Sequence, residues 1–86
     1  MNVVLLPQAK ADLAEITDPL LSRVIKRLQS LRNYPELGGA MTSPLIGYRS
    51  TVVAYLRIVY RVSGETVLVS YVRHCRFLNS RIPRPA

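Results

Sequence analysis

Arginine and histidine side chains recur at strand spacing in the second half of the sequence, and together they could bind and cleave a phosphodiester. Arg57 and Arg61 lie at even spacing in the segment Leu56–Ser63, and His74 ends the next apolar segment. Side chains at even spacing in a strand share one face of the sheet. Arginine binds phosphate through paired hydrogen bonds, and histidine can exchange a proton near neutral pH. A metal-independent ribonuclease needs both functions.

The turn between these two segments predicts which residues oppose each other. Gly64 and Glu65 suit a two-residue hairpin with glycine first. In the resulting register Tyr55 opposes His74, and Arg57 lies on the same face as His74, roughly 7–8 Å away at Cβ. The opposite face should pack against helices, and it contains Ile58, Tyr60, Val62, Val67, Val69 and Tyr71.

Further residues complete the predicted site. Arg76 continues the face of His74 if the strand runs on, so the predicted catalytic residues are Arg57, His74 and Arg76. Tyr55 could stack on a base. The alternative for His74 is a hydrogen-bonded structural histidine near a strand end. The predicted RNA- and phosphate-binding residues are Arg49, Arg61, Tyr55, Arg73 and Arg81.

The charge distribution indicates an anionic partner. Twelve Lys and Arg against five Asp and Glu give a formal net charge of +7. Residues 44–86 hold seven arginines, no lysine and a single acid, Glu65. Such asymmetry predicts binding to nucleic acid or to an acidic protein segment. The alternative is a solvated surface that only keeps the protein in solution.

The hydrophobic pattern predicts one α+β domain spanning residues 1–86, with a flexible tail at 81–86. With 86 residues, 49% of them apolar, the chain can form a single small core. We expect one N-terminal strand, a two-helix hairpin and a three-stranded antiparallel meander, with the helices packed on one sheet face. Asp18 should cap the second helix, with Pro19 at its first position. The expected elements are a strand at 2–6, helices at 8–16 and 19–33, and strands at 48–54, Leu56–Ser63 and Thr66–His74.

Other classes of function find little support in the sequence. One histidine, one cysteine and five scattered acids give no recognised metal-ligand spacing, so we expect neither a metal nor a cofactor. No apolar run approaches the roughly 18 residues that a membrane span requires. The start of the chain lacks a cationic segment before an apolar one, and the single Cys75 suits a reducing compartment. We therefore expect a cytoplasmic protein with no membrane partner.

Five short motifs, in order, resemble the RelE/ParE superfamily of bacterial toxins, the toxin halves of type II toxin–antitoxin modules. They are "AKADLAEI" in the first helix, "YPELGGAM" in the loop, and "GYRS", "RIVYRV" and "VRHCR" in the three later strands. The resemblance covers nearly the whole chain. It implies a compact α+β fold and neutralisation by a cognate antitoxin, which the basic charge predicts to be acidic.

The resemblance implies two possible targets. RelE-like members cleave mRNA in the ribosomal A site, and Arg57 and Arg76 match the positions of their phosphate-binding arginines. The short helical hairpin also resembles RelE. The lysine pair of that branch is replaced by Tyr48, Arg49 and Ser50, and its carboxy-terminal tyrosine is absent. Ribosome and mRNA are therefore the first expectation.

ParE-like members instead inhibit DNA gyrase and are not nucleases. The spacing from "GYRS" to "IVYRV" resembles ParE, as does Arg81, five residues after Arg76. ParE members usually have a longer helical hairpin than this chain. A gyrase inhibitor without nuclease activity is therefore the alternative, and an inactive or non-enzymatic member is the third possibility.

Overall fold

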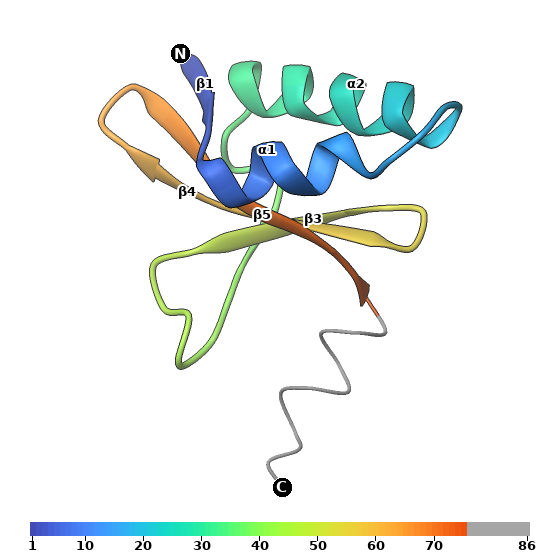
Figure 1. Ribbon diagram of the computed structural model, residues 1–86. Coiled ribbons are helices and arrows are strands. Elements are labelled where there is room, and N and C mark those ends of the chain that lie inside the picture. Colours follow the sequence, from blue (N-terminus) through green and yellow to red (C-terminus); the bar gives the residue numbers. More distant parts are fainter. Residues whose placement is uncertain (76–86) are drawn as a thin grey trace, which may run out of the picture.

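The computed structural model describes residues 1–75 and has two layers, a pair of helices and a five-stranded sheet (Figure 1). The predictions on Arg76, Arg81 and the tail 81–86 lie outside the described residues. The elements in chain order are β1 (Asn2–Leu5), α1 (Pro7–Ala14), α2 (Leu20–Asn33), β2 (Gly39–Ala40), β3 (Arg49–Val53), β4 (Leu56–Ser63) and β5 (Thr66–His74).

The sheet has the strand order β1-β5-β4-β3-β2, and both helices lie on one of its faces (Figure 1). β3, β4 and β5 form the predicted antiparallel meander, while β1 pairs in parallel with β5. The short β2 pairs with the start of β3. The α+β arrangement predicted from the hydrophobic pattern is confirmed. Across residues 1–75, no helix combines the length and apolar character needed to cross a membrane.

Both helices begin next to a proline. α1 starts at Pro7, whose fixed φ and missing N–H suit the first helical position. α2 starts at Leu20, one residue later than predicted, with Pro19 at its N-cap. Asp18 still serves this helix end, because its Oδ1 accepts hydrogen bonds from Ser22 N (3.0 Å) and Ser22 Oγ (2.7 Å). The predicted N-cap, Asp18, and the predicted first helical residue, Pro19, are therefore each one residue too early, although Asp18 does accept hydrogen bonds at this end of the helix.

A single core lies between the helices and the sheet. α2 contributes every third or fourth side chain to it, as an amphipathic helix does. From β4 come alternate residues, and Tyr60 is the largest of the fully buried side chains. The buried core residues are Ala9, Val24, Leu28, Leu31, Val53, Leu56, Ile58, Tyr60, Val67, Val69 and Val72.

The register of β4 and β5 follows the sequence prediction for its first half and then changes. Residues pair as predicted from the Gly64 turn up to Tyr60 opposite Val69. Beyond that point a β-bulge leaves Ser70 without a partner in β4, so that Val59 pairs with Tyr71. An extra residue in one strand shifts the alternation of all that follow. Four corrections follow for the later part of β5.

Val72, and not Tyr71, faces the helices, and it is 4% exposed. Arg57 now opposes Arg73, where Val72 was predicted. His74 opposes Leu56, where Tyr55 was predicted, and it therefore lies on the helix side of the sheet. Fourth, Arg57 and His74 are not diagonal neighbours on one face, so the Cβ separation predicted for that arrangement does not apply.

Charged side chains from the two helices cap the sheet edges that the short outer strands leave uncovered. Among the described residues, β1 covers only Thr66–Val69 of β5, and β2 covers only Arg49 and Ser50 of β3. Beyond β1, Asp12 Oδ2 accepts a hydrogen bond from Val72 N (2.9 Å). Beyond β2, Arg27 Nη1 donates to Val52 O (3.2 Å) and to the Thr51 hydroxyl. Such capping satisfies edge groups that would otherwise be open to other strands.

Candidate functional site

Arg57 and Arg73 lie opposite each other on the sheet face turned away from the helices. Directly opposed residues in an antiparallel pair share a side and have Cβ atoms about 4.5–5.5 Å apart. We call this surface the arginine face. By register and alternation it comprises Ser50, Val52, Arg57, Val59, Arg61, Leu68, Tyr71 and Arg73.

Arg57 is half-buried and held by a neighbouring strand. Its Nη1 donates a hydrogen bond to Ser50 Oγ (3.0 Å) in β3. Beside it, a hollow of about 260 Å³ lies between Arg57, Ser50 and the loop residues 40–45. The loop from β2 to β3 descends on the side of the sheet opposite the helices (Figure 1). Arg57 therefore forms one wall of a concave surface rather than extending into open solvent.

Arg73 is oriented by α1 and by an aromatic ring. Its Nε lies 3.8 Å from Asp12 Oδ2, and its guanidinium lies 5.2 Å from the centre of the Tyr71 ring. Asp12 is itself fixed, because Gln8 Nε2 donates to its Oδ1 (2.8 Å) and Val72 N to its Oδ2. A cation near an aromatic face is stabilised by the ring quadrupole. The same helix that caps the sheet edge thus also positions Arg73.

His74 lies apart from this pair. It is exposed at the end of β5 and stacks on Tyr55, with ring centres 4.9 Å apart and planes inclined by 34°. Tyr55 lies in the turn between β3 and β4 and is 54% exposed. The structure therefore brings Tyr55 and His74 together, as predicted, but places His74 on the opposite side of the sheet from Arg57. The predicted sharing of a face is wrong, because the bulge at Ser70 was not foreseen.

Arg49 has a different environment from the other strand arginines. It opposes Tyr60 on the helix side, and its Nε donates to Gly38 O (2.8 Å). Its Nη2 lies 3.5 Å from Glu36 O. Arg49 therefore ties the loop after α2 to the sheet, and it does not lie with Arg57. Arg61 does lie on the arginine face, roughly 13 Å along β4 from Arg57 at 3.3 Å per residue.

The side chain of Tyr60 in β4 holds the loop after α2 through two hydrogen bonds. The buried Tyr60 hydroxyl accepts a hydrogen bond from Gly38 N (2.9 Å) and donates one to Pro35 O (2.7 Å). A Cβ at Gly38 would lie 2.5 Å from Ser50 O and 2.8 Å from the Tyr60 hydroxyl. Only glycine fits this close approach. Gly38 is therefore required for the packing of this loop against β3 and Tyr60.

Sequence reasoning missed the roles of Asp12, Ser50 and Tyr71. For Asp12 a signal was present, because it follows the buried Ala9 by three residues and so lies on the same helix face. An acid on a buried helix face needs a partner. No comparable signal marks Ser50 or Tyr71, whose contacts depend on the bulge and on strand pairing. Among residues 1–75, no three His, Cys, Asp or Glu side chains group as metal ligands would.

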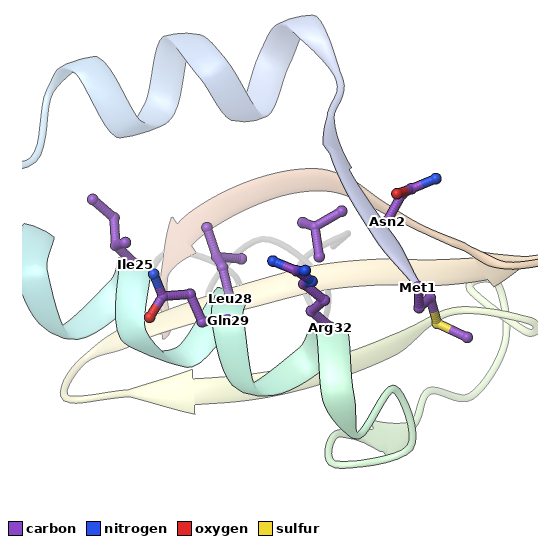
Figure 2. Close-up of a pocket in the computed structure, with 7 residues that line it drawn as sticks. Met1, Asn2, Ile25, Leu28, Gln29 and Arg32 are labelled. Atoms are coloured by element: carbon purple, nitrogen blue, oxygen red, sulfur yellow. The ribbon is translucent and has the colours of Figure 1, made fainter.

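A second concave surface lies on the helix side, between β1 and α2 (Figure 2). It has a volume of about 420 Å³. Ile25 and Arg32 project from α2 (Figure 2), and Ile25 is 42% exposed. The groove combines apolar side chains such as Ile25 and Leu28 with polar ones such as Gln29 and Arg32. Its lining residues are Met1, Asn2, Val3, Ile25, Leu28, Gln29 and Arg32.

Comparison with known proteins identifies the class of this fold. Residues 3–78 match the family described as the ParE toxin of the type II toxin–antitoxin system parDE. The chain belongs to this family, and it is therefore a toxin of a type II toxin–antitoxin module within the RelE/ParE superfamily. No curated protein matches the chain.

Solved structures from three kinds of toxin share the fold. The toxin–antitoxin complex RelBE2 from Mycobacterium tuberculosis is 26% identical, with a TM-score of 0.78, covering 85% of this chain and 95% of that chain. The YoeB–YefM complex from Staphylococcus aureus is 22% identical, with a TM-score of 0.71 over 86% and 95%. The chromosomal ParDE system from P. aeruginosa is 17% identical, with a TM-score of 0.71 over 86% and 95%. The RelBE2, YoeB–YefM and ParDE systems therefore all contain a chain with this fold.

Proposed function

We propose that this toxin arrests growth by cleaving mRNA on the ribosome, with the arginine face as its RNA-binding surface. The observation that carries the proposal is the opposition of Arg57 and Arg73 across β4 and β5. Both side chains are oriented before any ligand binds, Arg57 by Ser50 and Arg73 by Asp12 and Tyr71. Donors that are fixed in advance stabilise developing charge without a cost of reorganisation.

The reaction assigned to this surface is attack of a ribose 2′-hydroxyl on the phosphodiester that follows it in the RNA. The 2′-oxygen forms a bond to phosphorus while the bond to the 5′-oxygen breaks. The 2′-hydroxyl loses a proton, and the leaving oxygen gains one. Arg57 and Arg73 would hold the phosphate oxygens and stabilise the charge of the transition state. Arg76 and Arg61 are proposed to extend this cationic surface, as is Arg81.

His74 is proposed to take part in proton transfer, because it is the only histidine of the chain. Its place at the end of the sheet means that RNA must bend around the strand end to meet both Arg57 and His74. Tyr55, stacked on His74 and half exposed, would offer a ring to a base at that bend. The proposal for His74 therefore rests on its ability to exchange a proton. It no longer rests on a sheet face shared with Arg57.

A cognate antitoxin is the proposed protein partner. The related structures from M. tuberculosis and S. aureus are toxin–antitoxin complexes. The net charge of +7 favours an acidic partner. The groove between β1 and α2 combines apolar Ile25 with cationic Arg32, which suits an acidic amphipathic segment. The proposal places the toxin in the cytoplasm, together with the ribosome.

Inhibition of DNA gyrase is the second candidate function. The matched family is that of the ParE toxin, and the displacement of His74 from the arginine face removes one argument for nuclease chemistry. Expression in cells, with translation and DNA supercoiling assayed separately, discriminates the two. Rapid translation arrest with mRNA cut inside codons supports the nuclease, whereas trapped gyrase and a DNA-damage response with intact mRNA support the alternative.

A further inference from the structure

Three cations and a serine of α2 surround a hollow that is separate from the arginine face. Arg23, Lys26, Arg27 and Ser30 follow the helical spacing that places side chains on one face. With Val53 of β3 they line a hollow of about 410 Å³. None of these five lining residues is acidic. The hollow therefore concentrates positive charge at one point of the helix layer.

The hollow has a rigid base. Arg27 donates to Val52 O (3.2 Å) and to the Thr51 hydroxyl, so its guanidinium is fixed against the edge of β3. Arg23 and Lys26 are exposed and can reach a ligand above it. A fixed arginine beside two exposed cations can contribute to binding a phosphate without being ordered by the ligand.

The hollow also adjoins the arginine face around one edge of the sheet. Arg73 opposes Arg57, and Arg57 opposes Val52. The carbonyl of Val52 is in turn bonded to Arg27. Each of these steps is a direct pairing or a hydrogen bond, so the hollow on α2 and the arginine face are neighbours around the edge of β3.

We propose that this hollow is a second phosphate-binding site, which holds the backbone of single-stranded RNA that leaves the arginine face. The inference rests on the proposed function, from which it takes RNA as the polyanion. Among residues 1–75, Val53 is the only apolar residue that lines the hollow, and it is 4% exposed. The described lining therefore offers no anchor of the kind that protein interfaces use. Nucleic-acid interfaces are instead polar and strongly cationic.

The test measures how RNA binding depends on salt. A short fluorescein-labelled uridine oligonucleotide is titrated with purified toxin at several salt concentrations. The variant Arg23→Ala/Lys26→Ala loses two exposed charges at positions where alanine favours the helix. The control Lys10→Glu changes the net charge by the same amount on α1, at an exposed residue away from the hollow.

The double variant should bind the oligonucleotide more weakly, and its log–log salt slope should be smaller by about 1.4, or about 0.7 for each lost phosphate contact. Lys10→Glu should keep the slope of the parent toxin. Equal slopes for the double variant and the parent would overturn the inference. So would weaker binding of polyglutamate, but not of RNA, by the double variant, since the hollow would then bind acidic protein.

Cleavage by the unaltered toxin is measured in parallel in a cell-free translation reaction. If the toxin cleaves no mRNA but the salt slope of the double variant falls by the expected amount, the proposed function is refuted and the second phosphate site is supported. A toxin that cleaves mRNA with equal slopes would refute the second site alone. A parent toxin that does not bind the oligonucleotide would also overturn the second site.

Discussion

Arg57 and Arg73 face each other across β4 and β5 because Ser70 is left unpaired in a β-bulge. Without the extra residue, Val72 would oppose Arg57 and Arg73 would point toward the helices. Asp12 supports the altered register, since its carboxylate accepts the Val72 N–H on the uncovered edge of β5. The candidate site thus depends on one irregular residue in β5 and one acid in α1.

Replacement of either opposed arginine should disable cleavage. Arg57→Ala and Arg73→Ala should each lower the rate of mRNA cleavage on the order of 10²-fold or more, as the loss of a transition-state donor does. The rate is measured in cell-free translation with purified toxin, and Lys10→Ala serves as the control for lost charge. Cleavage at the parent rate in both arginine variants would remove the arginine face from the reaction.

Asp12 should matter for both stability and cleavage. Asp12→Ala leaves Val72 N without its acceptor, which should lower the free energy of unfolding by about 1–3 kcal/mol. Asp12→Asn keeps an acceptor of the same size but removes the charge beside Arg73, so we expect a smaller loss of stability with reduced cleavage. Urea unfolding and cleavage rates are compared for the two variants. Equal unfolding curves for Asp12→Ala and the parent protein would contradict this role.

The two adjacent glycines should respond differently to the same change. A Cβ at Gly38 would overlap Ser50 O and the Tyr60 hydroxyl, whereas a Cβ at Gly39 meets no atom within 4 Å. Gly38→Ala should therefore lower the free energy of unfolding by about 1–3 kcal/mol, and Gly39→Ala should change it by less than about 0.5 kcal/mol. Denaturant unfolding of both variants measures the difference. Similar values would show that the loop is not held as closely as the structure indicates.

His74 separates the two candidate mechanisms. His74→Gln keeps a polar side chain of similar size but cannot titrate, so it should lower cleavage by about 10²–10⁴-fold if His74 transfers protons. Growth arrest is compared for His74→Gln and Arg81→Ala. Full toxicity of the first together with none of the second would favour gyrase inhibition, because an inhibitor needs no proton transfer.

Binding of the antitoxin should weaken as salt is raised. The toxin has a net charge of +7, and attraction between exposed charges is screened over about 10 Å at 0.1 M salt. Calorimetric titration of the purified pair at low and high salt measures the effect. An affinity that does not change with salt would indicate docking through the apolar part of the groove alone, without help from Arg32.

Sequence reasoning predicted every element except the short β2, and half of the β4–β5 register, because turn chemistry and hydrophobic spacing are local signals. Gly64 determined the pairing as far as Tyr60 and Val69. The bulge was not predictable from alternation, although the spacing from Val69 to Val72 breaks the period of two. The contacts of Arg49 were not predictable for another reason, because its partners are carbonyl groups of the loop after α2. Such contacts with a distant loop do not produce a regular spacing of residue types in the sequence.

The most direct test of the account is to map the 5′ ends of an mRNA translated in a reconstituted system with the toxin present. The account predicts new ends inside codons that require the ribosome, and it predicts that they disappear when Arg57→Ala/Arg73→Ala replaces the parent toxin. Intact mRNA with the parent toxin, combined with loss of gyrase supercoiling in a matched reaction, would contradict it.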